Sequence, residues 1–374
     1  MNVLVIPDKF KGSLSASEVI HAIQAGLRKH DPEIQIHAIT ASDGGDGFLD
    51  AIRKSNDAVQ TIRCETTDPL GRTIMAEYGI DRHRKSAYIE MARASGMELL
   101  RQSERNPMLT TTLGTGLLLV DAIDRDLENI YIGLGGSATN DGGIGIAHAL
   151  GFRFLDSKGG ELQPIGGSLE QIDSIDVSGV TMTMKNVKVH AINDVTNPLT
   201  GPEGAATVYA PQKGADAEMV VLLERGLDRL QQVVCRDLGV DAAHVPGAGA
   251  AGGTGYGLKV FLGAEFLSGI EFVLSLTGIE SLLESGNVDW IISGEGKIDD
   301  QTGYGKLVCG VANIGKKYGV PVIALCGVNA LQHKTVADLG LAKVVSIHDP
   351  TRPLEYTIHN AKELLTKAAE HVFI

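Results

Sequence analysis

Residues 129–145 place a buried-strand pattern directly before a glycine-rich polar loop, and this arrangement limits the folds open to the chain. Ile130 and Ile132 fit a strand that ends at Gly133. The loop after it carries little side-chain bulk, so its backbone N–H groups and hydroxyls can approach an anion; its members are Gly135, Gly136, Ser137, Ala138, Thr139, Asn140 and Asp141. Asp141 can hold a magnesium ion or orient a hydroxyl. The simpler alternative is a strand-to-helix turn with Ser137 as the helix N-cap.

The same arrangement recurs along the chain. Strand-like runs at 2–6, 34–39, 187–192 and 290–292 are each followed by charged or glycine-rich loops. In open α/β sheets, ligands collect at the carboxyl ends of the strands. Helical patterns separate most of these runs, and Ser15 with Glu18 predicts a capping box at the start of the first helix. The pattern therefore predicts an α/β fold with parallel sheets.

The order of the patterns predicts two domains. Two strands near the N-terminus and three more near 290–292, 321–325 and 344–347 make five parallel strands. Between them, short runs at 59–64, 73–80 and 87–91 are typical of an antiparallel element. We expect one domain built from residues 1–57 and 261–374, with residues 58–260 inserted as the other. The segment 246–257, the densest in glycine, fits a hinge, a phosphate loop or both.

The amino-acid composition argues against two classes of binding partner. A net charge of -13 and a pI near 5.3 argue against nucleic acid and against an anionic membrane surface. The four cysteines form no CxxC pair, and no run of about 18 apolar residues or export signal is visible. We expect a cytoplasmic protein that acts on a small metabolite.

Several polar residues have two interpretations. Asp43 in the loop after 34–39, and Asp194 with Asn197 after 187–192, fit either a ligand site or an ordinary turn. Lys213 fits either an anion site or a solvated surface.

Two nucleotide motifs compete with this interpretation. Residues 310–317 have nearly the spacing of a P-loop, but Lys317 occupies the Ser/Thr position and the segment reads as helix, so we reject it. Residues 133–138 fit G-x-G-x-x-A, and Asp156 lies near the distance of a ribose-binding acid, which makes an NAD-dependent oxidoreductase of a small hydroxy acid the main alternative. Gly142, Gly143 and Gly145 weaken the helix that this fingerprint needs. A non-catalytic small-anion-binding protein is the third alternative.

The loops, taken in order, resemble those of the bacterial glycerate kinase family, the type that makes 2-phosphoglycerate. The motifs that carry the resemblance lie at residues 7–16, 43–47, 68–72, 106–116, 135–143, 194–199, 211–215, 247–253 and 293–299. The sequence departs from the family where Lys9, Asp46, Arg93 and Asn193 replace the usual Ser, Glu, Ala and Cys. The resemblance implies a flavodoxin-like domain with an inserted α/β domain, and an ATP- and Mg2+-dependent phosphotransferase acting on D-glycerate.

From this we predict the role of each candidate residue. The loop from Gly135 to Asn140 and Lys213 bind the ATP phosphates, and Lys11 also neutralises negative charge. Asp194 is the first candidate for the base that receives the 2-hydroxyl proton, and Asp43 is the second. Candidate glycerate-binding residues are Asp8, Lys9, Gly44, Gly45 and Asn197. Candidate magnesium ligands are Asp141, Glu295 and Asp299.

Overall fold

The structure is a computed structural model that describes all residues except 40–46, 181–186, 278, 304–306 and 374. The chain forms two compact units. We call Met1–Ser42 with Ser268–Ile374 the terminal unit and Asp43–Leu267 the inserted unit. In the described part of the chain, no helix is both long and apolar enough to cross a membrane.

The terminal unit contains a five-stranded, entirely parallel sheet. Its strands, in spatial order, are β13 (Lys343–Ser346), β12 (Val322–Ala330), β11 (Trp290–Asp299), β1 (Asn2–Pro7) and β2 (Gln35–Ala38). Numbered along this unit alone, the order reads 2-1-3-4-5, which is the flavodoxin order. The predicted flavodoxin-like fold is therefore confirmed.

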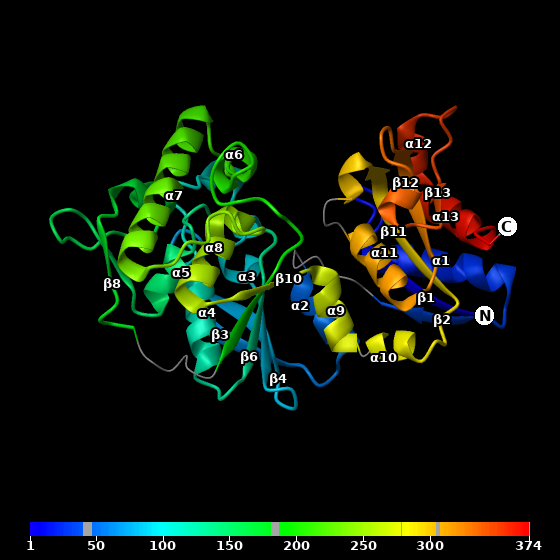
Figure 1. The fold of residues 1–374 in the computed structure, drawn as a ribbon, viewed down its shortest axis with the longest axis horizontal. Helices are drawn as coiled ribbons and strands as arrows, with labels where there is room; N and C mark the ends of the chain where they lie inside the picture. The colour runs from blue at the N-terminus through cyan, green and yellow to red at the C-terminus, as the bar shows by residue number, and fades with distance from the viewer. Residues whose placement is uncertain (40–46, 181–186, 278, 304–306, 374) are drawn as a thin grey trace. The chain divides into compact units, whose positions relative to one another are not determined.

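Helices cover both faces of this sheet because alternate residues of its buried strands point to opposite sides. Leu4 and Ile6 of β1 pack with α9 (Gly269–Thr277), α10 (Ile279–Glu284) and α11 (Leu307–Tyr318). Val3 and Val5 pack with α1 (Ala16–His30) and α13 (Ala361–Glu370), as Figure 1 shows. The predicted capping box opens α1, with Glu18 N donating to Ser15 Oγ at 3.3 Å and Ser15 N donating to Glu18 Oε2 at 2.9 Å.

The inserted unit contains a six-stranded mixed sheet. Its spatial order is β10 (Glu265–Leu267), β9 (Lys188–Ile192), β6 (Asn129–Gly133), β5 (Ser86–Glu90), β4 (Thr73–Asp81) and β3 (Gln60–Thr67). The first four strands are parallel, and β3, β4 and β5 form the predicted antiparallel element. Its core includes residues of α4 (Leu113–Ile123), α5 (Ile144–Ala149), α7 (Ala217–Leu238) and α8 (Ala250–Leu262).

Shorter elements complete the two units. They are α2 (Phe48–Ser55), α3 (Ala92–Ser95), α6 (Ala205–Tyr209), α12 (Leu354–His359), the antiparallel pair β7 (Arg153–Leu155) and β8 (Ser174–Asp176), and short 3-10 helices that include η3 (Gly166–Gln171), η5 (Pro211–Lys213) and η6 (Asp300–Gly303).

The predicted boundaries at 57/58 and 260/261 are shifted in the structure. Helix α2 belongs to the inserted unit, because Glu90 at the end of β5 accepts hydrogen bonds from Gly47 N at 2.9 Å and Leu49 N at 3.0 Å. Strand β10 also belongs there, since Glu265–Leu267 pairs with β9. Helix α2 contacts β4 and β5 of the inserted sheet, and β10 adds a strand to it, so both elements belong to the inserted unit.

Candidate functional site

The predicted residues of the terminal unit lie at its topological switch point, between β1 and β11. Asp8 follows β1, and its N–H donates to the carbonyl of Gly294 at 2.8 Å. The backbone of Lys11 passes close to Gly296, because a Cβ on Gly296 would lie 3.2 Å from the backbone nitrogen of Lys11. Lys9 and Lys11 are exposed. This is where an open α/β sheet places its ligands.

Asp299 is the last residue of β11, and Glu295 lies four residues earlier in the same strand. The two residues are linked through Thr302. The Thr302 hydroxyl donates to Glu295 Oε1 at 2.9 Å and accepts from Asp299 N at 3.1 Å. The Asp299 carboxylate also pairs with Lys297 Nζ at 3.1 Å. Among the described residues, no cluster of three or more His, Cys, Asp or Glu could enclose a metal ion. Two carboxylates still fit Mg2+, which proteins commonly hold with one or two carboxylates plus substrate phosphates.

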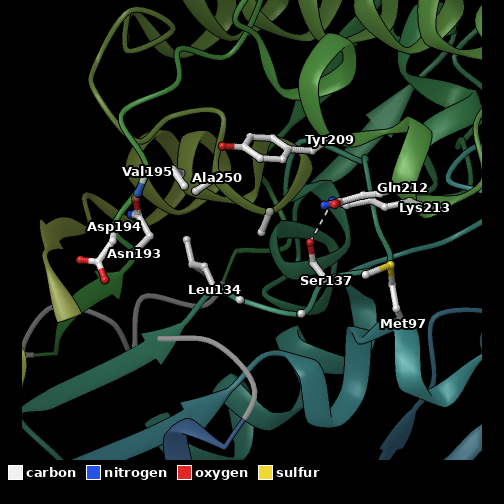
Figure 2. A pocket seen from close by; sticks show the side chains of 13 residues that line it. Met97, Leu134, Ser137, Asn193, Asp194, Val195, Tyr209, Gln212, Lys213 and Ala250 are labelled. Carbon is white, nitrogen blue, oxygen red and sulfur yellow. Dashed lines mark hydrogen bonds between the residues drawn. The ribbon is translucent and has the colours of Figure 1, made fainter. Parts of the chain in front are cut away.

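The inserted unit has a pocket of about 200 Å³ at the carboxyl ends of β6 and β9 (Figure 2). These strands are parallel neighbours, so the loops that follow them meet at one edge of the sheet. The lining includes the predicted Gly135, Gly136, Ser137, Asp194 and Lys213. The remaining lining residues are Met97, Leu134, Asn193, Val195, Tyr209, Gln212, Ala250 and Ala251. We call this hollow the inserted-unit pocket.

The loop after β6 presents unpaired backbone donors to this pocket. Gly136 adopts a left-handed φ of 71°, which turns the chain sharply after the strand. In the described part of the protein, the N–H groups of Gly135, Gly136 and Ser137 donate to no other residue. Backbone donors that have no protein partner and line a pocket are able to bind an anion, which is the chemistry that the predicted phosphate-binding loop requires.

Lys213 is a buried part of the same pocket, not a surface lysine. It is 2% exposed, and its Nζ donates to Ser137 Oγ at 2.9 Å and to the carbonyl of Thr139 at 2.7 Å. Burial lowers the pKa of Lys213 to about 7, although the negative charge of Asp141 opposes this shift. The side chain can therefore change its charge near neutral pH.

Asp141 has a different environment from the one the sequence predicts. Its fully buried carboxylate accepts hydrogen bonds from the N–H and hydroxyl of Thr112 and from the N–H groups of Gly143 and Gly145. Burial raises the pKa of Asp141, and these four bonds oppose the shift. With its oxygens occupied in this way, Asp141 organises the loop and is not placed to bind a metal.

Three further predicted phosphate-binding residues lie beneath the pocket. Ala138 is 2% exposed, and Thr139 and Asn140 are 0% exposed. The carbonyl of Thr139 holds Lys213, but its hydroxyl and the amide of Asn140 have no partner among the described residues. These three side chains therefore do not line the inserted-unit pocket.

Asn197 is held behind the pocket. Its Oδ1 accepts from Tyr209 OH at 2.7 Å, and its Nδ2 donates to the carbonyl of Glu203 at 2.8 Å. Tyr209 lines the pocket, whereas Asn197 does not. Tyr209 is not predicted from the sequence, because a single polar residue in a short helical run gives no pattern, and Gln212 is part of the 211–215 motif but has no predicted role of its own.

The glycine-rich segment before α8 is tightly packed. Ala251, Gly252 and Gly253 have left-handed φ values of 54°, 68° and 85°. A Cβ on Gly252 would lie 2.0 Å from the carbonyl oxygen of Thr139, and Gly142 N donates to the Gly252 carbonyl at 3.1 Å. The glycines thus allow close packing against the loop after β6, which replaces their interpretation as a hinge.

Asp43, Gly44 and Gly45 lie outside the described residues. The described structure resumes at Gly47, whose N–H donates to Glu90. Arg93 pairs with Glu90 at 3.4 Å and with Asp50 of α2 at 3.0 Å. The charge that Arg93 introduces is thus balanced by two carboxylates.

Two observations weaken the competing motifs. Residues 310–317 lie within α11, as predicted for a segment that is not a P-loop. Asp156 follows β7, which pairs antiparallel with β8, and its Oδ1 accepts from Lys158 N and Gly160 N at 2.8 Å each. It stabilises a surface turn, unlike the ribose-binding acid of a dinucleotide fold.

A doubly wound parallel sheet in one unit and a mixed sheet with a glycine-rich loop beside a buried lysine in the other define a two-unit α/β protein. Residues 3–374 match the Glycerate kinase family. The chain belongs to this family, which overturns the oxidoreductase and non-catalytic alternatives.

Individual relatives agree with this assignment. The glycerate kinase of Halalkalibacterium halodurans is 42% identical over 377 residues, covering 100% of this chain and 98% of that protein. The glycerate 2-kinase of Escherichia coli (strain K12) is 40% identical over 372 residues, covering 100% and 97%. A crystal structure from Salmonella typhimurium LT2, whose description proposes a glycerate kinase 2, has a TM-score of 0.81 and 41% identity, covering 100% and 97%.

Proposed function

We propose that this protein transfers the γ-phosphate of ATP to the 2-hydroxyl of D-glycerate, which yields 2-phosphoglycerate and ADP. The glycerate kinase family supports the kinase reaction, and the similarity to a glycerate 2-kinase supports the 2-position. The single observation that carries the proposal is the inserted-unit pocket, whose lining combines unpaired N–H groups, Lys213 and Asp194.

The anion-binding side of this pocket suits a transferring phosphate. Phosphoryl transfer needs little covalent chemistry from the protein, so positioning and charge neutralisation dominate. The N–H groups of Gly135, Gly136 and Ser137 would receive phosphate oxygens, and Lys213 in its charged form would neutralise them. Pockets for whole drug-sized ligands usually exceed about 300 Å³, so this smaller one would hold only part of the nucleotide.

Asp194 would serve the attacking hydroxyl. A carboxylate beside a phosphate site is electrostatically unfavourable unless a proton lies between the two. The 2-hydroxyl of glycerate supplies such a proton: it would pass to Asp194 while the oxygen bonds to the γ-phosphorus and the bond to the β-phosphate breaks. Asp43 stays the second candidate for this base.

The candidate residues of the terminal unit keep the roles that the sequence predicts for them. Glu295 and Asp299 would hold Mg2+, which would neutralise phosphate charge and orient the phosphoryl group. Lys11 would neutralise further negative charge, and glycerate would bind through Asp8, Lys9, Gly44 and Gly45. These roles stay predictions.

An assay of ADP release tests the proposal. The purified protein should consume ATP only when both D-glycerate and Mg2+ are present, and phosphorus NMR should identify 2-phosphoglycerate as the product. Formation of the 3-phosphate alone would contradict the proposed regiochemistry. Failure to release ADP with D-glycerate would contradict the proposed reaction.

A further inference from the structure

Ser137 and Lys213 form a hydrogen-bonded pair at the wall of the inserted-unit pocket (Figure 2). Lys213 Nζ has two protein acceptors, the Ser137 hydroxyl and the Thr139 carbonyl, and both are neutral. A buried ammonium whose partners are neutral recovers little of its lost hydration energy, so the neutral amine is favoured. The buried Asp141 carboxylate favours the ammonium instead, and the resulting pKa of about 7 leaves both forms accessible.

The neutral amine is well placed to activate Ser137. It can donate one N–H to the Thr139 carbonyl while its lone pair accepts the Ser137 hydroxyl proton across the 2.9 Å contact. Lys213 is also held in position, since Gly214 has a φ of 100° and packs so closely that its Cβ would lie 2.1 Å from the Arg105 carbonyl oxygen. A hydroxyl bonded to an oriented base is the arrangement of an activated nucleophile.

The loop that carries Ser137 also offers a place for developing negative charge. The N–H groups of Gly135, Gly136 and Ser137 are unpaired within the described residues. Such donors stabilise the oxygen of an electrophile that becomes negative during attack, as in the oxyanion holes of acyl-transfer enzymes. The nucleophile, its base and the charge-stabilising donors therefore occur in one wall of the pocket.

We propose that Ser137 and Lys213 form a serine–lysine nucleophile pair, which makes Ser137 a site of covalent modification by phosphonyl electrophiles with a good leaving group. With a phosphonofluoridate, Ser137 Oγ bonds to phosphorus, the P–F bond breaks and fluoride leaves. The Ser137 proton passes to Lys213 Nζ. The product is a phosphonylated serine, and no oxidant or further reactant takes part.

This reactivity is independent of the kinase reaction, but anions in the pocket should suppress it. A bound phosphate favours the ammonium form of Lys213, which has no lone pair, and it also occupies the N–H groups. Of the other titratable groups nearby, Asp141 lies behind the loop, and Asp194 and Tyr209 lie on the other walls of the pocket.

Labelling of the full-length protein with a phosphonofluoridate tests the proposal, with the modified peptide located by mass spectrometry. We expect one adduct, on Ser137, whose rate of formation rises with pH through about 7 and then levels off, following the pKa of Lys213. Tripolyphosphate should protect the protein from the reagent. Ser137→Ala should abolish the adduct. Ser285→Ala, which removes an exposed serine that donates to the Leu282 carbonyl and accepts from Asn287 Nδ2 but contacts no amine base among the described residues, should not.

Two lysine variants separate the base from a packing role. Lys213→Met removes the amine, and Lys213→Arg keeps a cation without a usable lone pair. Both should label more slowly by about 10²-fold or more, the usual minimum for loss of a general base. Circular dichroism checks that each variant is folded. If only one of the two variants folds, its labelling rate alone tests the role of Lys213 as the base. Labelling of Lys213→Met at the wild-type rate, or a wild-type adduct elsewhere than Ser137, would overturn the proposal whatever the kinase assay shows.

Discussion

Asp141 accepts two hydrogen bonds from a single residue, Thr112: one from its backbone N–H at 2.7 Å and one from its hydroxyl at 2.8 Å. The Thr112 hydroxyl in turn accepts from Ile146 N at 3.1 Å, so this pair joins the start of α4 to the start of α5. The chain between Asp141 and β6 is the glycine-rich loop that lines the inserted-unit pocket. The position of that loop therefore depends on a buried carboxylate.

We predict that Asp141→Asn lowers the free energy of unfolding by about 3 kcal/mol, because an amide nitrogen would face donors where a charged acceptor was buried. Urea denaturation measures the change. Asp156→Asn is a matched control, since Asp156 accepts from two N–H groups in a surface turn and should cost less than about 1 kcal/mol. Equal losses in the two variants would show that burial of Asp141 is unimportant.

Lys213 should make stability depend on pH. Its pKa is about 7 in the folded protein and near the ordinary 10.5 in the unfolded chain. Between these values the unfolded state binds more protons, so the free energy of unfolding should rise with pH in this window and change little below it on account of this group. Denaturation at pH 7 and pH 9 should show a larger rise for the wild type than for Lys213→Met. The reverse order would contradict a neutral buried lysine.

The sequence predicted the elements of this fold better than their boundaries. Strand patterns identified the five parallel strands because apolar runs and the loops after them are local signals. The assignment of α2 to the inserted unit depends on Glu90, which is far from Gly47 in sequence, and no local pattern reveals such a contact.

The candidate site, like the fold, was predictable where the signal is local and not where it depends on tertiary contacts. Gly135, Ser137 and Asp194 were predictable because each follows a strand at the ligand-binding edge of a sheet. Burial was not predictable: the sequence left Lys213 open between an anion site and a solvated surface, and it proposed Asp141 as a metal ligand. Tertiary contacts decide which charged residues lose their water. They bury Lys213 in the pocket lining and surround the Asp141 carboxylate with hydrogen-bond donors.

Asp194→Asn should lower kcat by about 10²- to 10⁴-fold, because the amide keeps the size of the carboxylate but cannot take up the 2-hydroxyl proton. Substrate affinity should change less. Steady-state ADP release measures both quantities, and Asp43→Asn is assayed beside it. Near-normal turnover of Asp194→Asn together with a slow Asp43→Asn would assign the base to Asp43.

Alanine variants of Gly252 and Gly263 distinguish the cost of a left-handed backbone from the cost of a steric contact. They have similar φ values of 68° and 66°, but a Cβ on Gly252 meets the Thr139 carbonyl at 2.0 Å, whereas one on Gly263 meets nothing within 4 Å. In both alanine variants the left-handed backbone conformation should lower the free energy of unfolding by about 1–2 kcal/mol. Only Gly252→Ala must also push away the glycine-rich loop after β6, so it should lose more stability and also turnover. Equal losses on urea denaturation would show that the contact relaxes without cost.

The last prediction concerns Asn197, which the sequence proposed as a glycerate ligand and which the structure places behind Tyr209. If Asn197 acts by orienting the Tyr209 hydroxyl, removing either residue's contribution removes the same ligand contact. Asn197→Ala and Tyr209→Phe should each raise KM by about 5-fold, the equivalent of one neutral hydrogen bond of about 1 kcal/mol.

The double variant Asn197→Ala/Tyr209→Phe shows whether Asn197 acts by orienting the Tyr209 hydroxyl or by contacting the substrate itself. Acting through Tyr209, Asn197 should add nothing once the hydroxyl is gone, so the double variant should resemble either single one. Circular dichroism and urea denaturation of all three variants control for misfolding, because Asn197 also donates to the Glu203 carbonyl. A KM raised by about 25-fold in the double variant, the product of the single effects, would mean that Asn197 contacts the substrate independently of Tyr209.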